Sequence, residues 1–412
     1  MRIFKILLPL LIISMIQSQC SLRGTDSDDQ SEKKNFTGAE KKLAQSGNEF
    51  AFKLFQGINN EGPNSNIFIS PLSVSYALGM AYNGAAGETR EAIQNTLELS
   101  GLSLEEINIS YKGLMNYLTG CDEKLEVSIA NSIWSRNGVK LKDQFVGLNS
   151  DYFDATVTSL DFSSPDAAEI INKWVDDNTN GKIAQIVQPP IDPAMMLFLI
   201  NAVYFKGTWT YQFDPNETRD EIFYAGNPPY KTYPFMAQKV EIPYFANTTF
   251  HAVDIPYGDG LYRMAVLVPI SGSIDDLAEL CTSDNWDIWM DSFVEQEVNL
   301  FLPKFKLELA YKLNDVLISL GMGAAFNGAL ADFSNITETI GLYISKVKHI
   351  TFVEVNEEGT EAAAVTSIEM CGSTGEEPLE IFFRADRPFL FVIHETESNS
   401  ILFMGKVMQP TQ

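Results

Sequence analysis

Basic side chains are scarce in this sequence of 412 residues. Its 54 acidic residues outnumber its 29 lysines and arginines, and the formal net charge at pH 7 is −25. Nucleic acids and heparin are polyanions, and proteins hold them through basic patches that displace counterions. The densest basic spots in this chain are short and diluted by neighbouring acidic residues. We therefore expect neither nucleic acid nor heparin as a partner.

Cysteine is also scarce, with four residues in the whole chain. So few cysteines exclude a scaffold that is held together by many disulfides. Cys20 stands near the N-terminus, while Cys121, Cys281 and Cys371 lie far from one another in the sequence. The sequence leaves the pairing of these last three residues open.

The short motifs that carry catalysis or bind coenzymes are absent as well. The sequence has no Gly-x-Ser-x-Gly elbow, no His-Glu-x-x-His, no Cys-x-x-Cys and no glycine-rich phosphate loop. Its three histidines, His251, His349 and His394, are far apart, although a fold can bring distant residues together. Because no site for a nucleophile, metal or coenzyme stands out, we predict that the protein is not an enzyme and needs no cofactor.

The apolar run at the N-terminus is too short to cross a bilayer. Arg2 and Lys5 precede or flank the apolar residues 6–16, whereas a membrane-spanning helix needs about 20 such residues. A basic start followed by a short apolar segment is typical of a secretory signal peptide. We predict a signal peptide at residues 1–19 and hence a secreted, extracellular protein.

A polar and acidic tract follows this segment, and we interpret residues 20–46 as a disordered tether. Cys20 opens the tract, as the lipid-modified cysteine does in bacterial and archaeal lipoproteins. Gln19, directly before it, departs from the lipoprotein pattern. A protein anchored at the cell surface by a lipid on Cys20 is therefore the alternative to a freely secreted one.

Hydrophobic periodicity beyond residue 47 changes along the chain from helical to strand-like. Residues 197–205 are apolar almost throughout, which predicts a strand buried on both faces. Helices cluster early and strands late, so we predict one α+β domain at residues 47–410. Helices are expected at residues 47–58, from Pro71 onward, and at 87–99, 165–178 and 311–320. Strands are expected at residues 67–69, 125–133, 197–205, 252–256, 263–269, 298–303, 350–355, 389–394 and 401–407.

One stretch after residue 355 has an unusual composition. In an extended chain from Thr360 onward, one face would carry small and apolar side chains, and Glu361 and Glu369 would lie on the other. Gly359 supplies a bend at the base of this stretch. The many alanines equally suit a surface helix that Thr360 caps. Composition alone therefore leaves a strand and a helix open.

This stretch resembles the hinge of the reactive loop in the serpin family, and the chain resembles that family from about residue 47 to residue 410. The resemblance implies an α+β serpin domain with three β-sheets, about eight to nine helices and an exposed reactive-centre loop at about residues 357–380. The matching hinge residues are Glu357, Gly359, Thr360, Glu361, Ala362, Ala363 and Ala364.

Other motifs extend the resemblance to residues that control the opening of the main sheet. Ser70 and Ser73 lie in the sequence Ser-Pro-Leu-Ser, at the start of a helix. Asn201 lies in Leu-Ile-Asn-Ala-Val-Tyr-Phe, and His349 precedes the hinge at the spacing usual in the family. In the family, side chains at these positions form hydrogen bonds where two central strands part to admit the loop.

Two further residues resemble those that lie, in the family, at the point where insertion of the loop begins. Trp209, in Phe-Lys-Gly-Thr-Trp, matches the tryptophan that lies beneath this point in the family. Lys304, in Leu-Pro-Lys-Phe, would form an ion pair with Glu357. Both residues could instead have a purely structural role. The tryptophan could simply be part of the hydrophobic core, and a surface ion pair contributes only about 0–1 kcal/mol to stability.

The resemblance implies an inhibitor that forms a covalent complex with a serine protease. The protease attacks the loop, and the cleaved loop then inserts into the main sheet and traps the acyl-enzyme. The composition from Thr360 to Met370 suits insertion, since its buried face carries no charge and no proline. The alternative is a non-inhibitory serpin that acts as a binding or chaperone module. We expect a monomer.

The commonest loop length of the family places the reactive bond between Ser373 and Thr374, with Met370 and Cys371 as alternatives. Residues 360–383 contain no arginine or lysine, which disfavours trypsin-like proteases as targets. We therefore expect elastase-like, chymotrypsin-like or subtilisin-like target proteases.

Overall fold

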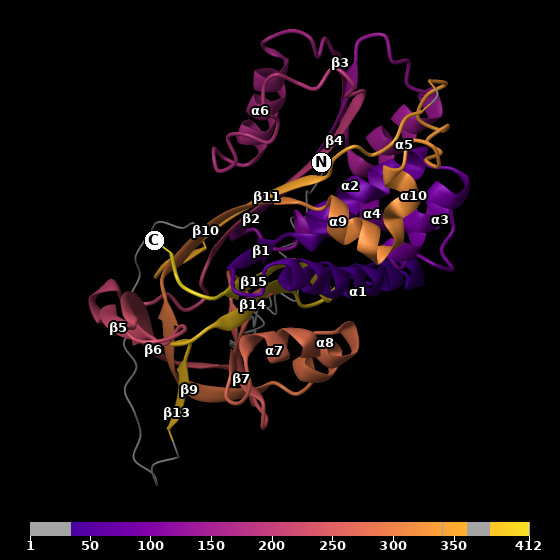
Figure 1. Ribbon diagram of the computed structural model, residues 1–412. Coiled ribbons are helices and arrows are strands. Elements are labelled where there is room, and N and C mark those ends of the chain that lie inside the picture. Colours follow the sequence, from indigo (N-terminus) through magenta and orange to yellow (C-terminus); the bar gives the residue numbers. More distant parts are fainter. Residues whose placement is uncertain (1–33, 340, 361–379, 412) are drawn as a thin grey trace, which may run out of the picture. The chain divides into compact units, whose positions relative to one another are not determined.

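Two hydrogen-bonded β-sheets and the helices packed against them make up the described part of the chain (Figure 1). The computed structural model describes residues 34–339, 341–360 and 380–411. The chain divides into two units, Met1–Asn35 and Phe36–Gln412, and both sheets belong to the second. Among the described residues, no helix is both long enough and apolar enough to span a membrane.

The order of the elements agrees with the predicted sequence of early helices and late strands. In chain order the helices are α1 (Gly38–Glu61), α2 (Pro71–Gly84), α3 (Gly87–Thr96), α4 (Leu104–Leu118), α5 (Asp143–Phe153), α6 (Ala167–Asn178), the short η1 (Pro215–Glu217), α7 (Ile274–Leu280), α8 (Ser283–Met290), α9 (Asn314–Leu317), η2 (Ile318–Met322) and α10 (Gly323–Phe326). The strands are β1 (Ile67–Ile69), β2 (Leu125–Arg136), β3 (Thr156–Leu160), β4 (Leu197–Thr208), β5 (Arg219–Phe223), β6 (Lys231–Ala246), β7 (Phe250–Pro256), β8 (Tyr262–Pro269), β9 (Val294–Pro303), β10 (Phe305–Lys312), β11 (Lys348–Val355), β12 (Gly359–Thr360), β13 (Ile381–Arg384), β14 (Phe389–Glu395) and β15 (Ser400–Val407).

The strands of the described residues form two networks. The six-stranded sheet has the order β10-β11-β12-β4-β2-β3, and the nine-stranded sheet has the order β1-β15-β14-β8-β7-β6-β9-β13, with β5 on β6. The α+β single domain is confirmed. The three sheets expected from the resemblance are joined into two, because β6 pairs with β7 at its end and with β9 and β5 along the rest of its length.

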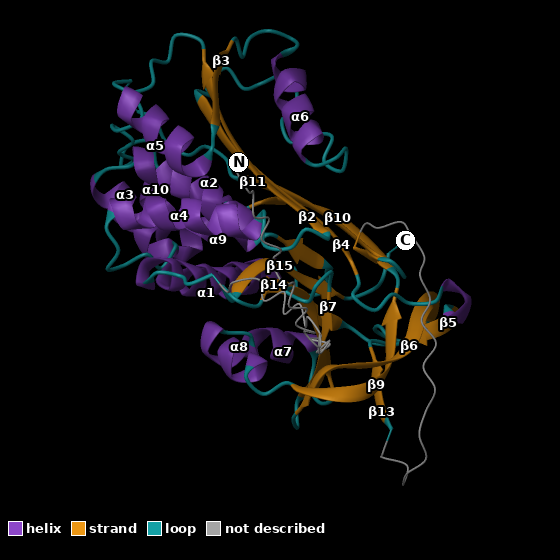
Figure 2. Ribbon diagram, turned by 180° about the vertical axis from the view of Figure 1, so that it is seen from behind, coloured by secondary structure: helices purple, strands orange, loops and turns teal. Residues whose placement is uncertain are grey.

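Helices lie on both faces of the six-stranded sheet. Helix α6 contacts β2 and β4 from one side, and α2 contacts the same strands from the other (Figures 1 and 2). Aromatic side chains fill the space between the two sheets. Phe68 of β1 stacks on Phe391 and on Phe403, with ring centroids 5.7 and 5.3 Å apart, and Phe403 also contacts Phe205 of β4. This rigid layer forms the floor beneath the six-stranded sheet.

Helix α1 begins at Gly38, earlier than the sequence predicted. The Thr37 hydroxyl accepts a hydrogen bond from the Glu40 backbone N–H (3.1 Å), and the Glu40 carboxylate accepts one from the Thr37 N–H (2.8 Å). This capping box starts the helix, and Leu43 and Ala44 are already buried. The prediction of a disordered tether is therefore wrong over residues 38–46, while residues 1–33, with the predicted signal peptide and Cys20, lie outside the described residues.

Other differences have local causes. Residues 311–312 end strand β10, so the helix expected at 311–320 begins only at Asn314, because Tyr311 pairs with His349 of β11. Strand β4 alternates between buried and partly exposed residues and is not buried on both faces. Helices α7 and α8 were not predicted, although the capping box of Ser273 and Asp276 marks the start of α7.

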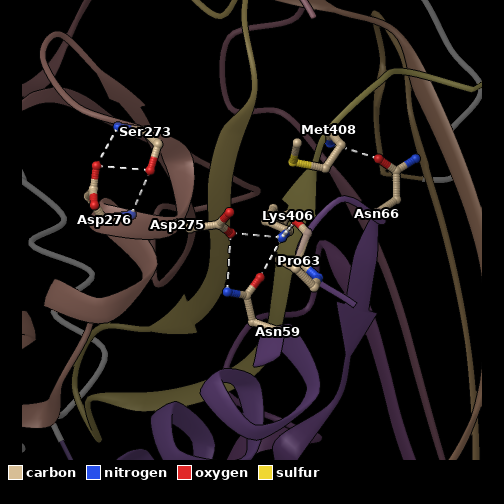
Figure 3. A network of polar contacts seen from close by, with 8 residues as sticks. All are labelled: Asn59, Pro63, Asn66, Ser273, Asp275, Asp276, Lys406 and Met408. Atoms are coloured by element: carbon tan, nitrogen blue, oxygen red, sulfur yellow. Dashed lines mark hydrogen bonds and ion pairs between the residues drawn. The ribbon is translucent and has the colours of Figure 1, made fainter. Parts of the chain in front are cut away.

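Lys406 carries a buried ammonium group where β15 meets α1 and α7 (Figure 3). Its Nζ donates hydrogen bonds to Asn59 Oδ1, to the Pro63 carbonyl oxygen and to Asp275 Oδ1, the last at 3.2 Å. Burial lowers the pKa of Lys406, and the Asp275 carboxylate opposes this effect. The cluster ties the end of α1 to the first turn of α7.

We expect the change Lys406→Met to destabilise the native protein by about 2 kcal/mol or more, because methionine fills the space but removes the buried donor that bonds to Asn59, Pro63 and Asp275. The measurement is the free energy of unfolding in guanidinium chloride. The matched control is Lys173→Met, since Lys173 is exposed on α6 and pairs with Asp177 at the surface. Equal stability of the Lys406 and Lys173 variants would contradict a structural role for the cluster.

Candidate functional site

The hinge enters the six-stranded sheet as the two-residue strand β12. Thr360 pairs with Val355 of β11 on one side and with Gly207 of β4 on the other, and Gly359 pairs with Thr208. Thr360 is 3% exposed. The first hinge residues therefore already occupy a strand position between β11 and β4.

Below this point β11 and β4 are separate. Both strands are fully described, and no backbone ladder joins them directly, since only β12 links them in the sheet. A pocket of about 360 Å³, including the space at its open side, lies between them. Its walls include Val203 of β4, Phe352 of β11 and Thr360, and its floor includes Phe68 and Phe403 of the second sheet. The sheet is thus held apart beneath the hinge.

Position 359 requires glycine, because the backbone there has a positive φ and passes close to Gly207. Its φ is +152°, and a Cβ at this position would lie 2.0 Å from the carbonyl oxygen of Gly207. Any side chain would therefore force β12 away from β4. The preceding turn is closed by the hydrogen bond from the Asn356 N–H to the Gly359 carbonyl oxygen (3.0 Å).

Two aromatic side chains that directly follow β4 and β7 support the hinge from beneath. Trp209, 2% exposed, stacks on Tyr257 with ring centroids 4.3 Å apart, and its Nε1 donates to the Asn356 carbonyl oxygen (2.9 Å). The Tyr257 hydroxyl is hydrogen-bonded to Thr360 Oγ1 (2.7 Å). Sequence reasoning found Trp209 but missed Tyr257, because its partner lies 103 residues away and no local motif marks it.

An ion pair fixes the outer end of the hinge. Lys304 Nζ lies 2.7 Å from Glu357 Oε2, and the Thr218 hydroxyl donates to Glu357 Oε1 (2.8 Å). Burial alone would raise the pKa of the Glu357 carboxyl, but the hydrogen bonds from Lys304, its own backbone and Thr218 outweigh burial and lower it. The structure thus brings the sequence-predicted pair together and adds Thr218 as a third member.

The segment after α6 crosses the open part of the sheet. Thr179, Lys182 and Ile183 line the pocket, and the Lys182 ammonium lies over the Phe352 ring, 4.7 Å from its centroid. Ile183 is 9% exposed and Thr179 is 1% exposed. A strand that entered between β4 and β11 would have to move this segment aside.

The residues expected to control sheet opening are brought together only in part. The Ser70 N–H donates to His349 Nε2 (2.9 Å), and the Ser70 hydroxyl donates to the Leu402 carbonyl oxygen while accepting from the Ser73 N–H. Pro71 occupies the first turn of α2, as predicted. Ser70, Ser73 and His349 therefore form one contact network at the start of this helix.

Asn201 is the exception. Its Nδ2 donates to Asn131 Oδ1 on β2 (2.8 Å), so the side chain bonds to the neighbouring strand and not to Ser70 or His349. Its Oδ1 is buried and has no hydrogen-bond donor among the described residues. The separation of β4 from β11 accounts for this, since Asn201 lies on β4 and His349 lies on β11.

The predicted reactive bond cannot be placed. Ser373, Thr374 and the alternatives Met370 and Cys371 lie outside the described residues, as do the hinge residues Glu361, Ala362, Ala363 and Ala364. The choice between strand and helix for this stretch stays a prediction, as does the position of the bond.

The described residues present no reactive group arranged for catalysis. Burial raises the pKa of the Cys121 thiol to about 11 and that of the Cys281 thiol to about 12, so neither is an activated nucleophile, and neither forms a disulfide. The histidines have separate neighbours: His349 contacts Ser70, His394 pairs with Asp254 (2.9 Å), and His251 lies against Phe383. No group of histidine, cysteine and acidic side chains in the described ranges could hold a metal ion.

Fold and hinge together define an α+β protein whose six-stranded sheet is held open by a short segment of its own chain. Residues 45–410 match the family model described as Serpin (serine protease inhibitor). The chain belongs to the serpin family. Family membership also agrees with the prediction that the protein is not an enzyme.

Individual relatives span most of the chain. An uncharacterized serpin-like protein of Thermococcus kodakarensis is 34% identical over 380 residues, which cover 90% of this chain and 87% of the relative. The leukocyte elastase inhibitor of Xenopus laevis is 33% identical over 383 residues, covering 89% of this chain and 99% of the relative. Among solved structures, human thyroxine-binding globulin complexed with thyroxine has a TM-score of 0.82 at 29% identity, with 91% of this chain and 100% of that chain covered.

His349 predicts a specific pH dependence of stability. Burial lowers its pKa from 6.5 to about 4, so it is neutral in the native protein and its Nε2 can accept the Ser70 hydrogen bond. Between pH 6.5 and about 4, the unfolded chain binds a proton here that the native protein does not, so this contribution to stability is lost as the pH falls through that window.

We expect His349→Gln to reduce the loss of stability between pH 7 and pH 4.5 by up to about 3 kcal/mol, because glutamine keeps an acceptor but cannot be protonated. The measurement is the denaturant midpoint of native unfolding at each pH. His251→Gln is the comparison, since the pKa of His251 is also lowered to about 4 by burial, at a site away from the sheet opening. Parallel pH profiles of parent and His349→Gln would contradict the assignment.

Proposed function

We propose that the protein is a suicide-type inhibitor of serine proteases, which traps the acyl-enzyme by inserting its cleaved loop between β4 and β11. One observation carries the proposal: Thr360 already pairs with both strands, while the strands themselves share no ladder beneath it. The segment that follows Thr360 would continue the same strand downward. Its small, uncharged face suits that position.

In this mechanism the protease serine attacks a carbonyl carbon of the loop. The peptide bond breaks, the new amino group leaves with a proton from the protease, and an ester joins the protease to the N-terminal part of the loop. Cleavage removes the tether that keeps the loop outside the sheet. Insertion from Thr360 onward then carries the attached protease along and distorts its catalytic residues before water hydrolyses the ester.

The free energy of insertion is sufficient for this purpose. Roughly a dozen added backbone hydrogen bonds at about 0.5–1.5 kcal/mol each contribute on the order of 10 kcal/mol. Burial of Ile368 and Met370 adds about 1.5–3 kcal/mol each. Separating residues 179–183 from the sheet costs part of this gain, including the contact between Lys182 and Phe352. The native form is therefore a kinetic trap, and cleavage releases it.

The target class follows from the loop sequence. With Ser373 before the reactive bond, a protease with a small primary pocket would be favoured, and the absence of lysine and arginine from residues 360–383 disfavours trypsin-like enzymes. The relative named leukocyte elastase inhibitor supports an elastase-like target. Chymotrypsin-like and subtilisin-like enzymes complete the proposed range.

The test is incubation of the full chain with elastase, chymotrypsin and subtilisin, followed by denaturing gels and mass spectrometry of the released C-terminal peptide. We expect a band at the summed mass that survives boiling, and a peptide that begins at Thr374. Cleavage within residues 361–379 without such a band for any of the three enzymes would overturn the inhibitory mechanism.

Thr360→Arg should convert the inhibitor into a substrate. Thr360 is already buried between β4 and β11, so an arginine charge there would displace β12 from the strand position that insertion must extend, and insertion would fall behind hydrolysis of the acyl-enzyme. We expect the fraction of protease trapped per cleaved inhibitor to fall by roughly tenfold or more. Thr360→Ser is the matched control, because it keeps the hydroxyl that bonds to Tyr257. If Thr360→Arg trapped protease as well as Thr360→Ser, insertion would not be the trapping step.

The second candidate is a non-inhibitory serpin that binds a ligand or another protein. The observation in its favour is the structural likeness to thyroxine-binding globulin, which was solved with thyroxine bound. In that case the loop would be cleaved as an ordinary substrate and the cleaved protein would gain little heat stability. An inhibitory serpin gains stability on cleavage, so melting curves before and after cleavage separate the two candidates.

We also propose that the protein is exported through residues 1–19 and acts as a monomer outside the cytoplasm. Lipid attachment at Cys20 is the alternative form of the same proposal. Its support is the sequence alone: a basic start, a short apolar segment and then a cysteine. Fractionation of expressing cells, with and without Cys20→Ser, distinguishes a released protein from a membrane-attached one.

A further inference from the structure

Four asparagines of the chain stand directly before a glycine: Asn83, Asn137, Asn180 and Asn327. In such a pair the glycine nitrogen can attack the side-chain carbonyl carbon of the asparagine, because glycine has no side chain that hinders ring closure. In a folded protein this attack requires a free glycine N–H, a free asparagine amide and space for the ring. The four pairs differ in all three respects.

Two of the pairs are held by hydrogen bonds. Asn83 is 2% exposed on α2, and its amide both donates to and accepts from the amide of Asn108 (3.0 and 2.9 Å). After Asn180, the Gly181 N–H donates to the Asp176 carbonyl oxygen (2.9 Å). At both pairs a group that must react is already bonded, so reaction requires local opening of the fold.

Asn327 is less restrained. It lies on the surface after α10, but its Oδ1 accepts a hydrogen bond from the Ala329 N–H (2.9 Å). The Tyr343 ring packs closely against Gly328 and leaves little space around this glycine. Ring closure at Asn327 would have to break the first contact and disturb the second.

The turn after β2 meets all three requirements. Asn137 and Gly138 are both exposed, and nothing lies within 4 Å of the place that a Cβ on Gly138 would take. Within the described ranges, the Gly138 N–H donates to no acceptor. The Ser159 hydroxyl of β3 donates to Asn137 Oδ1 (2.9 Å). This atom is the one on which negative charge develops when the glycine nitrogen attacks, and a donor aimed at it stabilises the transition state.

We propose that Asn137 is a site of spontaneous deamidation. The Gly138 nitrogen loses its proton to a base in the solvent and forms a bond to Asn137 Cγ. The bond between Cγ and Nδ2 breaks, and the amide nitrogen takes up a proton and leaves as ammonia. Water then opens the resulting succinimide at either carbonyl, which gives aspartate or isoaspartate.

The reaction would alter the place where the outer strand of the six-stranded sheet is attached (Figure 1). The Asn137 N–H donates to the Leu160 carbonyl oxygen at the end of β3 (2.9 Å), and the Val139 N–H closes the turn onto the Arg136 carbonyl oxygen (3.0 Å). Isoaspartate adds a carbon atom to the backbone inside this turn, and aspartate adds a charge. Conversion should therefore weaken the attachment of β3 to β2.

The experiment follows all four Asn-Gly pairs in one sample. The full chain is kept at mildly alkaline pH, once in its native form and once in guanidinium chloride, and is then digested with pepsin at low pH, where deamidation is slow. Mass spectrometry gives the fraction of each peptide whose mass has risen by about 1 Da. Protein isoaspartyl methyltransferase labels the isoaspartate product.

Three variants isolate the contributions of the site. Ser159→Ala removes the donor to Oδ1, and Ser159→Thr keeps a hydroxyl as its control. Asn137→Gln has a longer side chain that closes a ring only slowly, so it separates this site from all others. Melting temperatures before incubation verify that the variants are folded.

We expect Asn137 in the native protein to convert on the order of tenfold faster than Asn83 and Asn180, and at a similar rate to them in guanidinium chloride. Ser159→Ala should slow the conversion by about twofold to tenfold, whereas Ser159→Thr should not. The melting temperature of the parent should fall during incubation, and that of Asn137→Gln should fall less.

Three results would contradict these expectations. Conversion of Asn137 in the native protein that is no faster than that of Asn83 or Asn180 would overturn the site. A mass increase without isoaspartate would overturn the succinimide route. Equal rates in Ser159→Ala and Ser159→Thr would overturn the part assigned to the hydroxyl.

Discussion

The pairing of Thr360 with β11 and β4 at the same time is the constraint on which the rest of the structure depends. A segment of two residues joins these strands at one end, and the strands are otherwise apart. Gly359 permits the close approach to Gly207, Tyr257 holds the Thr360 hydroxyl, and Glu357 is fixed by Lys304. Each contact serves to keep a short strand in place at the top of an incomplete sheet.

The two sheets differ in how firmly they are held. The nine-stranded sheet has an aromatic layer at the end formed by β1, β15 and β14, where Phe68 stacks on Phe391 and Phe403. Among the described residues, the six-stranded sheet has no strand beside β4 beyond β12 on the side that faces β11, a buried amide oxygen of Asn201 without a donor, and a pocket beneath Thr360. Unsatisfied polar groups and unfilled space raise the free energy of the native form locally. In the described part of the chain both features lie where β4 and β11 separate, although unpaired buried atoms also occur at Arg90 and Ser110.

Much of the fold followed from the sequence, but contacts between distant residues did not. The α+β class, the start of α2 at Pro71 and the Lys304–Glu357 pair followed from motifs and from the family resemblance. Tyr257 and Thr218 were missed, since each acts on a residue more than a hundred positions away and neither lies in a local pattern. Asn201 was assigned the wrong neighbours, because strand separation is a tertiary property. The early start of α1 was not predicted, because the polar composition of residues 38–46 indicated a tether. The capping box of Thr37 and Glu40 starts the helix there despite this composition.

The strand order also governs when the molecule can fold. Strands β14 and β15 are the last to be synthesised, yet they lie inside the nine-stranded sheet, between β1 and β8. Asn66 and Gln409, which bond at 2.8 Å, are 343 residues apart. A nascent chain on the ribosome therefore has no complete core until its final residues emerge, and contacts of such long range form slowly. Until β14 and β15 arrive, the floor beneath the hinge does not exist, because Phe391 and Phe403 belong to these two strands.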